Sequence, residues 1–300
     1  MSLGAEMVRE EAGTSLECTG AQSAGNDLPV VVFERRSGWR LLDLRELWRY
    51  RELLYFLAWR DVKVRYKQTV LGAAWAVLQP FATMIVFTLF LGRLVGTSAA
   101  NVPYPLFVFS ALLPWIFFAN AISTAGQSVV ISTNLVTKVY FPRVMIPVGT
   151  VVASLVDFAV AIAMLLAMMM FYHVAPGWNL LLAPLLVLGL VITTIGVGAL
   201  LAALTVAYRD FRQIVPFMVQ LWMFATPTIY MDADRVISPS WLPWLHLNPA
   251  YGLIANFRAA VLGRRLDLYS LGVSAAVGIL LLVLGCLYFR RVERSFADII

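Results

Sequence analysis

Long apolar stretches without charged residues alternate with short polar segments over most of the chain after residue 69. A helix that crosses the hydrocarbon core of a bilayer needs about 20 residues, because each residue advances the helix by about 1.5 Å. The turn-forming segment 173–179 divides one stretch that is too long for a single helix. The pattern predicts an all-α polytopic membrane protein with a six-span transmembrane domain over residues 69–294. The predicted spans are about 70–92, 104–123, 144–172, 181–207, 214–230 and 268–289.

One further uncharged stretch, residues 236–257, is long enough to cross a membrane but carries Pro239, Pro243 and Pro249 among polar residues. Proline removes backbone donors, and lipid offers nothing to replace the lost hydrogen bonds. We therefore expect a broken re-entrant or interfacial segment before the last span instead of a seventh spanning helix.

The region before the first span has two parts. Residues 1–38 are rich in Gly, Ser, Glu and Thr and lack the layout of a signal peptide, which predicts a mobile cytoplasmic tail. Residues 39–68 show a helical pattern that predicts an amphipathic interfacial helix. Because Arg51 and Phe56 interrupt the pattern, a solvated helix packed on a partner protein is the alternative. The apolar stripe consists of Leu44, Leu47, Trp48, Tyr55 and Ala58, and the polar face of Arg45, Arg49 and Glu52.

The composition agrees with a membrane protein and excludes soluble classes. The chain is 61% hydrophobic and 13% charged, so a soluble enzyme or a nucleic-acid-binding protein is not expected. With both termini inside, most of the 23 lysines and arginines lie on the cytoplasmic side, as the positive-inside rule requires. Residues 295–300 then form a cytoplasmic C-terminus. The basic residues left outside are Arg93, Arg235, Arg258, Arg264 and Arg265.

Few residues offer chemistry of their own. Cys18 and Cys286 cannot form a disulfide framework, and His173 and His246 stand alone, so no metal or other cofactor is expected on this chain. A phosphate-binding loop is absent from the sequence, so ATP and Mg²⁺ would have to bind a partner ATPase. The pair Asp232 and Asp234 weakly resembles a metal-binding Asp-x-Asp.

Asp157 is the one acidic residue inside a predicted span. A charge at this depth usually marks a transport pathway or a buried pairing. A hydrogen-bonded packing role with Ser or Thr on a neighbouring helix is the alternative.

Aromatic residues are abundant in and beside the first, second and fifth predicted spans. Their faces suit stacking on sugar rings without a fixed register, as a polymer sliding through a pore would need. The alternative is ordinary lipid-facing bulk and interfacial belts. The candidates for a glycan path are Phe81, Phe87, Phe107, Trp115, Phe118, Trp222, Phe224 and Tyr230.

A series of short motifs resembles the membrane subunits of type-2 ABC exporters that move polysaccharides. The resemblance covers about residues 45–294, with Thr226 where many relatives have serine, and it leaves out the segment before Trp39. In chain order the motifs are RDVKVRYK (60–67), LGAAW (71–75), LQP (78–80), NLVTKVYFPR (134–143), IP (146–147), YRD (208–210), TPTIY (226–230), LNP (247–249), FR (257–258) and LG (262–263).

The resemblance implies a permease subunit in the cell inner membrane without a catalytic site of its own. It implies a homodimeric channel, two copies of a cytoplasmic ABC ATPase beneath it, and a polyprenyl-diphosphate-linked glycan such as an O-antigen, capsule or teichoic-type polymer. The implied ATPase-docking residues are Arg60, Asn134, Lys138, Tyr140, Phe141, Pro142, Arg143, Arg209 and Asp210. The lipid diphosphate would meet Arg60, Lys63, Arg65 and Lys67, and the outer gate would contain Trp241, Trp244 and Pro249.

Two rival functions remain open from the sequence. One is an exporter of drugs or small lipids with the same architecture, for which fewer aromatic residues along the path are expected. The other is a membrane enzyme acting on polyprenyl-linked glycans, with Asp232, Asp234 or Asp157 as its carboxylates.

Overall fold

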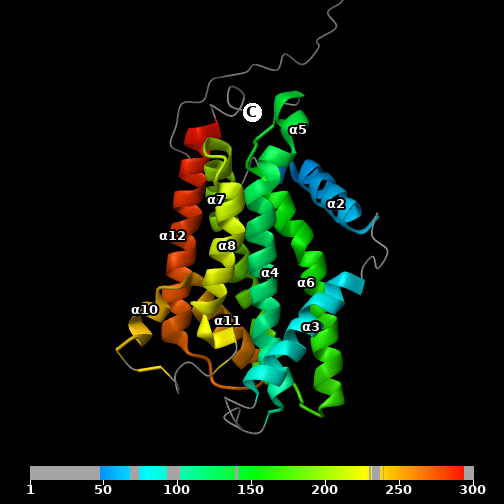
Figure 1. Ribbon diagram of the computed structural model, residues 1–300, viewed down its shortest axis with the longest axis vertical. Helices are drawn as coiled ribbons and strands as arrows, with labels where there is room; N and C mark the ends of the chain where they lie inside the picture. The colour runs from blue at the N-terminus through cyan, green and yellow to red at the C-terminus, as the bar shows by residue number, and fades with distance from the viewer. Residues whose placement is uncertain are drawn as a thin grey trace, which may run out of the picture. The chain divides into compact units, whose positions relative to one another are not determined.

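The structure is a computed structural model that describes residues 48–67, 74–92, 102–138, 141–229, 231, 237–238 and 240–293, all within the unit Trp39–Ile300. These residues form helices and no strands (Figure 1). The elements are α2 (Arg51–Lys67), α3 (Ala74–Leu91), α4 (Tyr104–Ile131), α5 (Thr133–Lys138), α6 (Met145–Phe171), η1 (Trp178–Leu182), α7 (Ala183–Ala207), α8 (Phe211–Phe224), η2 (Pro227–Ile229), α10 (Leu242–His246), α11 (Pro249–Val261) and α12 (Leu268–Glu293). The predicted tail, residues 1–38, lies outside the described residues, as do the first part of the predicted interfacial helix and residues 295–300.

Five helical stretches in the described part are long and apolar enough to cross a membrane. They are Ala74–Leu91, Tyr104–Ile131, Met145–Phe171, Trp178–Ala207 and Leu268–Glu293, which correspond to five of the six predicted spans. The predicted span 214–230 is not one continuous helix. α8 has 14 residues and ends at Phe224, before the separate 3₁₀ turn η2. At 1.5 Å per residue α8 is about 21 Å long, shorter than the hydrocarbon core of about 30 Å.

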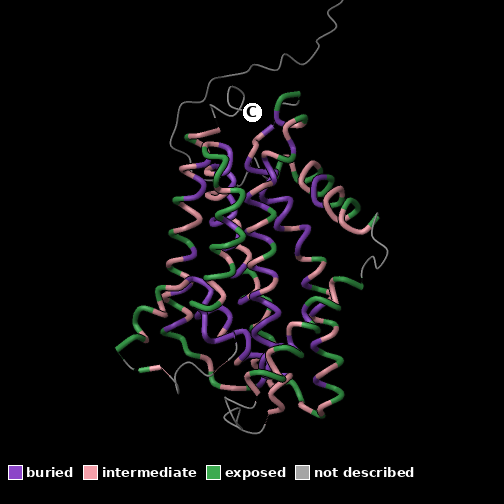
Figure 2. The backbone as a smooth tube through the Cα atoms, in the orientation of Figure 1, coloured by how far each residue is buried: buried purple, intermediate pink, exposed green. Residues whose placement is uncertain are grey.

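α4 is the central helix of the described bundle. It contacts α3, α6, α7, α8 and α11, and its apolar residues are buried along most of its length (Figure 2). The large side chains of Phe107, Phe109 and Phe118 have at most 2% of their surface exposed. The central position of α4 therefore comes from burial of its aromatic residues against five neighbouring elements.

α7 and α12 approach each other through glycines. A Cβ atom added at Gly196 would lie 2.5 Å from the backbone of Leu282, and one added at Gly285 would lie 2.2 Å from the carbonyl oxygen of Gly196. Small residues at a helix crossing let two backbones pack closely, which is a main source of helix association in lipid. We call this contact the glycine seam.

α2 lies along α6 and both helices run in the same direction. Leu57 packs on the backbone at Gly149, the hydroxyl of Thr150 donates to Asp61 Oδ2 over 3.1 Å, and one turn further Arg65 and Tyr66 bond Asp157. Contacts at three successive turns of α2 fix the register of the pair. Of the predicted apolar stripe, Ala58 is buried here, whereas Trp48 and Tyr55 are exposed.

The proline-rich segment is broken, as expected, into the short helices α10 and α11. Asn248 begins α11 as its N-cap, and its side-chain oxygen accepts from the amide of Ala250. α11 packs against α4, α7 and α12 and is almost wholly buried. α11 ends at Val261, and Gly263 follows it with a φ of 65° that suits glycine. The amide of Arg264 donates back to the carbonyl oxygen of Ala259 over 2.8 Å.

Candidate functional site

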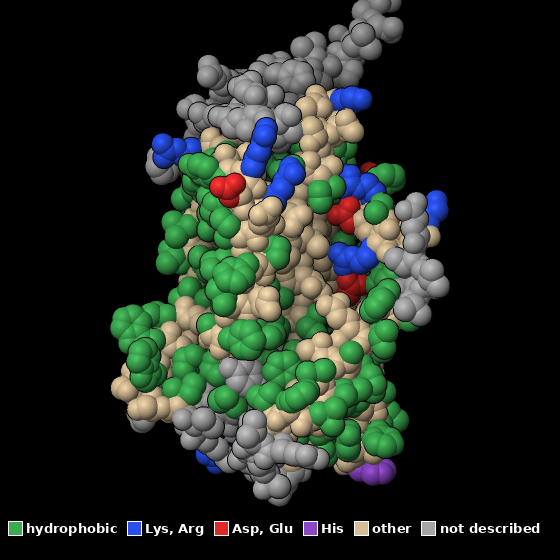
Figure 3. Space-filling model, viewed as in Figure 1, with side chains coloured by type: hydrophobic (Ala, Val, Ile, Leu, Met, Phe, Trp, Pro, Cys, Tyr) green, Lys and Arg blue, Asp and Glu red, His purple; other side chains and the backbone are tan. Residues whose placement is uncertain are grey.

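Candidate residues gather at the two opposite ends of the bundle. One end, which we call the α5 end, holds α5, the turn between α7 and α8, and the last turn of α12 (Figure 1). The other, the α10 end, holds α10, α11 and η2. On the face seen in Figure 3, most lysines and arginines lie on α2 or towards the α5 end, and hydrophobic side chains cover much of the remainder.

At the α5 end the structure separates exposed from anchored docking candidates. Asn134, Lys138, Arg209 and Asp210 are exposed. Phe141 is 5% exposed and packs in an apolar cluster with residues of α2, α6, α7 and α12. Phe141 therefore holds the loop before α6, residues 141–144, on the bundle and is not accessible at the surface. Tyr140 lies outside the described residues, and Pro142 is half-buried.

Arg143 fastens the same loop to the end of α12. Its backbone amide donates to Glu293 Oε1 over 2.9 Å, and its Nη1 donates to the carbonyl oxygen of Glu293 over 2.6 Å. Charge-assisted hydrogen bonds of this length are about twice as strong as neutral ones. The loop therefore has two connections. It runs directly into α6, and Arg143 hydrogen-bonds it to α12.

The four basic residues predicted to meet a lipid diphosphate are not equivalent. Arg60 pairs with Asp61 at 2.9 Å and also donates to Ser132 Oγ at 3.3 Å. Arg65 pairs with Asp157, which also accepts from Tyr66. Lys63 and Lys67 are exposed. Two of the four positive charges are therefore offset by carboxylates of the same chain.

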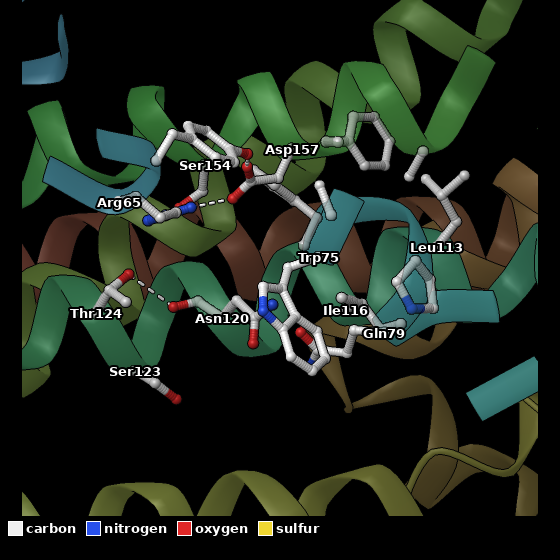
Figure 4. Close-up of a pocket in the computed structure, with 16 residues that line it drawn as sticks. Arg65, Trp75, Gln79, Leu113, Ile116, Asn120, Ser123, Thr124, Ser154 and Asp157 are labelled. Carbon is white, nitrogen blue, oxygen red and sulfur yellow. Dashed lines mark hydrogen bonds and ion pairs between the residues drawn. The ribbon is translucent and has the colours of Figure 1, made fainter. Parts of the chain in front are cut away.

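The Arg65–Asp157 pair settles one of the alternatives for Asp157. Its partners come from α2 and not from Ser or Thr on a neighbouring helix, so Asp157 forms a half-buried pair with Arg65, and its part in a transport pathway stays a prediction. The pair forms part of the wall of a cavity of about 380 Å³ between α2, α3, α4 and α6 (Figure 4). We call it the Trp75 cavity. Its polar wall also includes Gln79 and Asn120, which the sequence interpretation did not select, although both are isolated amides within apolar stretches.

A second cavity, of about 680 Å³, lies at the α10 end. It brings together four aromatic residues that the sequence assigned to two different roles: Trp222 and Phe224 to the glycan path, and Trp241 and Trp244 to the outer gate. Tyr230, predicted for the same path, lies outside the described residues. Pro249 is buried at the start of α11 and acts in the packing of that helix.

Asn248 joins the elements around this second cavity. Its Oδ1 accepts from Trp222 Nε1 over 2.9 Å, and its Nδ2 donates to Thr226 Oγ1 over 2.8 Å. The same oxygen caps α11. The motifs at 226–230 and 247–249 are therefore two halves of one hydrogen-bonded junction, and Thr226 supplies the hydroxyl that serine would supply.

Arg258, in the motif at 257–258, holds η2 from the inside. It is 5% exposed, its Nη1 donates to the carbonyl oxygen of Thr228 over 2.6 Å, and its guanidinium carbon lies 4.1 Å from the centre of the Phe107 ring. A buried cation over an aromatic face gains about 2 kcal/mol when it is desolvated. Arg258 thus joins η2 to α4 through α11.

The remaining path candidates differ in exposure. Phe107, Trp115 and Phe118 are at most 3% exposed and pack within this chain, Phe118 edge-on to Trp222. A glycan would reach them only if neighbouring helices moved. Phe81 is exposed and Phe87 is half-buried. The glycan-path assignment stays a prediction for all of these residues.

The rival enzymatic site gains no support from the described residues. Asp232 and Asp234 lie outside them, and Asp157 is engaged by Arg65 and Tyr66. In the part of the chain that the structure describes, there is no group of three or more His, Cys, Asp or Glu side chains that could hold a metal ion.

Comparison with known proteins defines the class of protein. Residues 52–262 match the ABC-2 type transporter family, and the chain belongs to this family of multi-pass membrane proteins. The resemblance to type-2 ABC exporters is therefore confirmed.

Individual relatives align over nearly their whole length. The chain is 33% identical to the O-antigen export system permease protein RfbA of Myxococcus xanthus, across 85% of this chain and 98% of that protein. It is 26% identical to an O-antigen export system permease protein RfbA of Klebsiella pneumoniae, across 83% and 95%. It is 22% identical to the polysialic acid transport protein KpsM of Escherichia coli, across 79% and 92%.

Proposed function

We propose that this chain is the permease subunit of an ATP-driven exporter that carries a lipid-linked polysaccharide, of the O-antigen or capsule kind, across the bacterial inner membrane. Two copies form the channel, and two copies of a separate ATPase that binds ATP and Mg²⁺ dock beneath it. The observation that carries the proposal is the alignment with three relatives named for O-antigen export or polysialic acid transport over at least 92% of their own lengths.

The proposed topology has six crossings with both termini in the cytoplasm. α8 and η2 together make the fifth crossing, and α10 and α11 form the broken segment on the outer side. The α5 end is then cytoplasmic, which agrees with the basic residues gathered towards that end (Figure 3).

The ATPase docks on the α5 end. Asn134 and Lys138 on α5 and Arg209 and Asp210 in the α7–α8 turn present exposed polar groups there, and Phe141 anchors the loop behind them. Since Arg143 links this loop to α12, ATPase movement at the loop reaches both α6 and α12. Export follows from a shift between packed states that the ATPase contacts differently.

The lipid-linked glycan makes two kinds of contact. Its diphosphate meets Lys63 and Lys67, whose ammonium groups are exposed near the end of α2. Its sugars leave past the aromatic cavity at the α10 end, where Trp222, Phe224 and Trp241 offer ring faces. The short exposed helix α10, with Trp244, gates this exit.

The test is to purify the chain together with the ATPase encoded beside its gene and to measure ATPase activity in nanodiscs with and without lipid-linked glycan. We expect a complex with two copies of each subunit and stimulation by the glycan. Replacing Lys138 and Arg209 by Glu should abolish the stimulation, because both docking charges are reversed. Arg265→Glu, the same charge reversal at an exposed site of the α10 end, is the matched control and should retain it.

Two results would contradict the proposal. Stimulation by small amphiphiles but not by the glycan would favour a drug or small-lipid exporter. Metal-dependent turnover of a polyprenyl-linked glycan by the chain alone would favour the enzyme and make Asp232, Asp234 and Asp157 the next residues to replace.

A further inference from the structure

The described residues that line the Trp75 cavity carry no net charge. Sixteen residues line it, and the charged ones among them are Arg65 and Asp157, which pair with each other. An anionic ligand would meet the carboxylate of Asp157 as well as the guanidinium of Arg65. A phosphate site usually gathers unopposed positive charge or backbone amides. The cavity is therefore built for an uncharged ligand.

The cavity nevertheless presents polar groups that the described part of the chain does not use. Gln79 on α3 and Asn120 on α4 are exposed, and neither side-chain amide has a hydrogen-bond partner among the described residues. Both lie inside helices long and apolar enough to cross a membrane. Lipid tails cannot satisfy an amide, so such residues face a polar ligand, a water-filled space or another helix.

An aromatic face completes the cavity. Trp75 is 51% exposed, and its ring lies near the middle of the view in Figure 4, with the Arg65–Asp157 pair above it and Asn120 beside it. Ser123 and Thr124 also line the cavity from the next turn of α4, although the hydroxyl of Thr124 donates to the carbonyl oxygen of Asn120 over 2.7 Å. An indole face together with amides, hydroxyls and a carboxylate offers apolar contact, donors and acceptors within one concave wall.

We propose that the Trp75 cavity binds an uncharged sugar unit of the transported glycan. Ring C–H groups stack on Trp75, and hydroxyls, which both donate and accept, bond the side-chain amides of Gln79 and Asn120. The volume of about 380 Å³ falls within the range of small-molecule sites, near its lower end, and suits one or two sugar rings. This inference rests on the proposed function and adds to it a sugar site distinct from the contact with the lipid diphosphate.

The experiment measures binding to the purified permease–ATPase complex in nanodiscs with two probes. One is the oligosaccharide released from the host polysaccharide by mild acid, which carries no lipid or phosphate, and the other is inorganic pyrophosphate. The variants are Gln79→Met and Asn120→Leu, which remove one amide each at nearly constant volume, and Trp75→Leu. The controls are Gln127→Met on α4 and the exposed Trp178→Leu, both outside the cavity.

We expect each cavity variant to bind the oligosaccharide about three- to tenfold more weakly, as the loss of one hydrogen bond or one stacking contact implies. Pyrophosphate binding, basal ATPase activity and thermal stability should not change, and the two controls should match the original protein. A general folding defect would reduce all of these readouts together, so it would not imitate the expected pattern.

Three outcomes would overturn the inference: unchanged oligosaccharide affinity in the variants, loss of pyrophosphate binding instead, or a disulfide between two copies through Asn120→Cys, which would show that a second copy covers this wall. The affinity for free oligosaccharide decides the sugar site. Stimulation by the lipid-linked glycan decides the proposed function, so failure of one is distinguishable from failure of the other.

Discussion

Replacing Gly196 by Ala should force α7 and α12 apart. The new Cβ would lie 2.5 Å from both the Cα and the amide nitrogen of Leu282, whereas ordinary contacts begin at 3.4 Å. The obstacle is backbone, so it cannot rotate away, and the helices must separate by about 1 Å. A gap of this size forfeits about a quarter to a half of each contact energy along the seam.

The expected cost follows from two opposing effects. Overpacking a close contact costs about 1–3 kcal/mol, and Ala in place of Gly within a helix returns about 0.5–1 kcal/mol. We expect Gly196→Ala to lower the free energy of unfolding by about 1–2 kcal/mol. Gly272→Ala is the matched control, because it lies on α12 and nothing is within 4 Å of its added Cβ. It should be neutral or slightly stabilising.

The assay is reversible unfolding by SDS in mixed micelles, with both variants measured beside the original protein. Gly285→Ala, whose Cβ would lie 2.2 Å from the carbonyl oxygen of Gly196, should repeat the loss. Equal stability of Gly196→Ala and Gly272→Ala would show that the glycine seam does not hold these helices together.

Three further predictions concern the hydrogen-bonded junctions. Asn248→Ala should lower the free energy of unfolding by about 2 kcal/mol, because it removes a helix cap and two side-chain hydrogen bonds. Asn248→Asp should recover part of the loss. Full stability of the Ala variant in the SDS assay would contradict the predicted role of Asn248. Asp157→Ala should release the last turn of α2, seen as faster amide exchange there with unchanged exchange in α12. Arg143→Ala and Glu293→Ala should be non-additive by about 1 kcal/mol in a double-mutant cycle, and simple additivity would rule out their coupling.

Helix positions were largely predictable because apolar length determines where a chain can cross a membrane. The ends of the helices were less predictable. α4 continues to Ile131, past the predicted end at residue 123, because its polar residues bond within the helix, as Ser128 Oγ does to the carbonyl of Ala125 over 2.7 Å. α8 stops early at Phe224 because the chain turns into η2, where Thr226 joins Asn248.

Candidate residues could be selected from the sequence by their type, but the residues that they contact could not. Asp157 stands out in any hydropathy pattern, yet its partner Arg65 lies 92 residues away in a different motif. Likewise, the sequence placed Trp222 on the path and Trp241 at the gate, and the fold alone shows that they line one cavity. Pairings of this kind depend on helix packing across the bundle and leave no local pattern in the sequence.

The bond between Arg143 and Glu293 has a practical consequence for anyone handling the protein. Glu293 lies seven residues before Ile300, so an expression tag fused after Ile300 would follow it closely in the sequence. A truncation that removes Glu293 would delete two hydrogen bonds between Arg143 and the end of α12, although Glu293 lies outside the motifs named above. We expect shortened versions of this chain to weaken the attachment of a residue 150 positions earlier, while Phe141 still packs on the bundle.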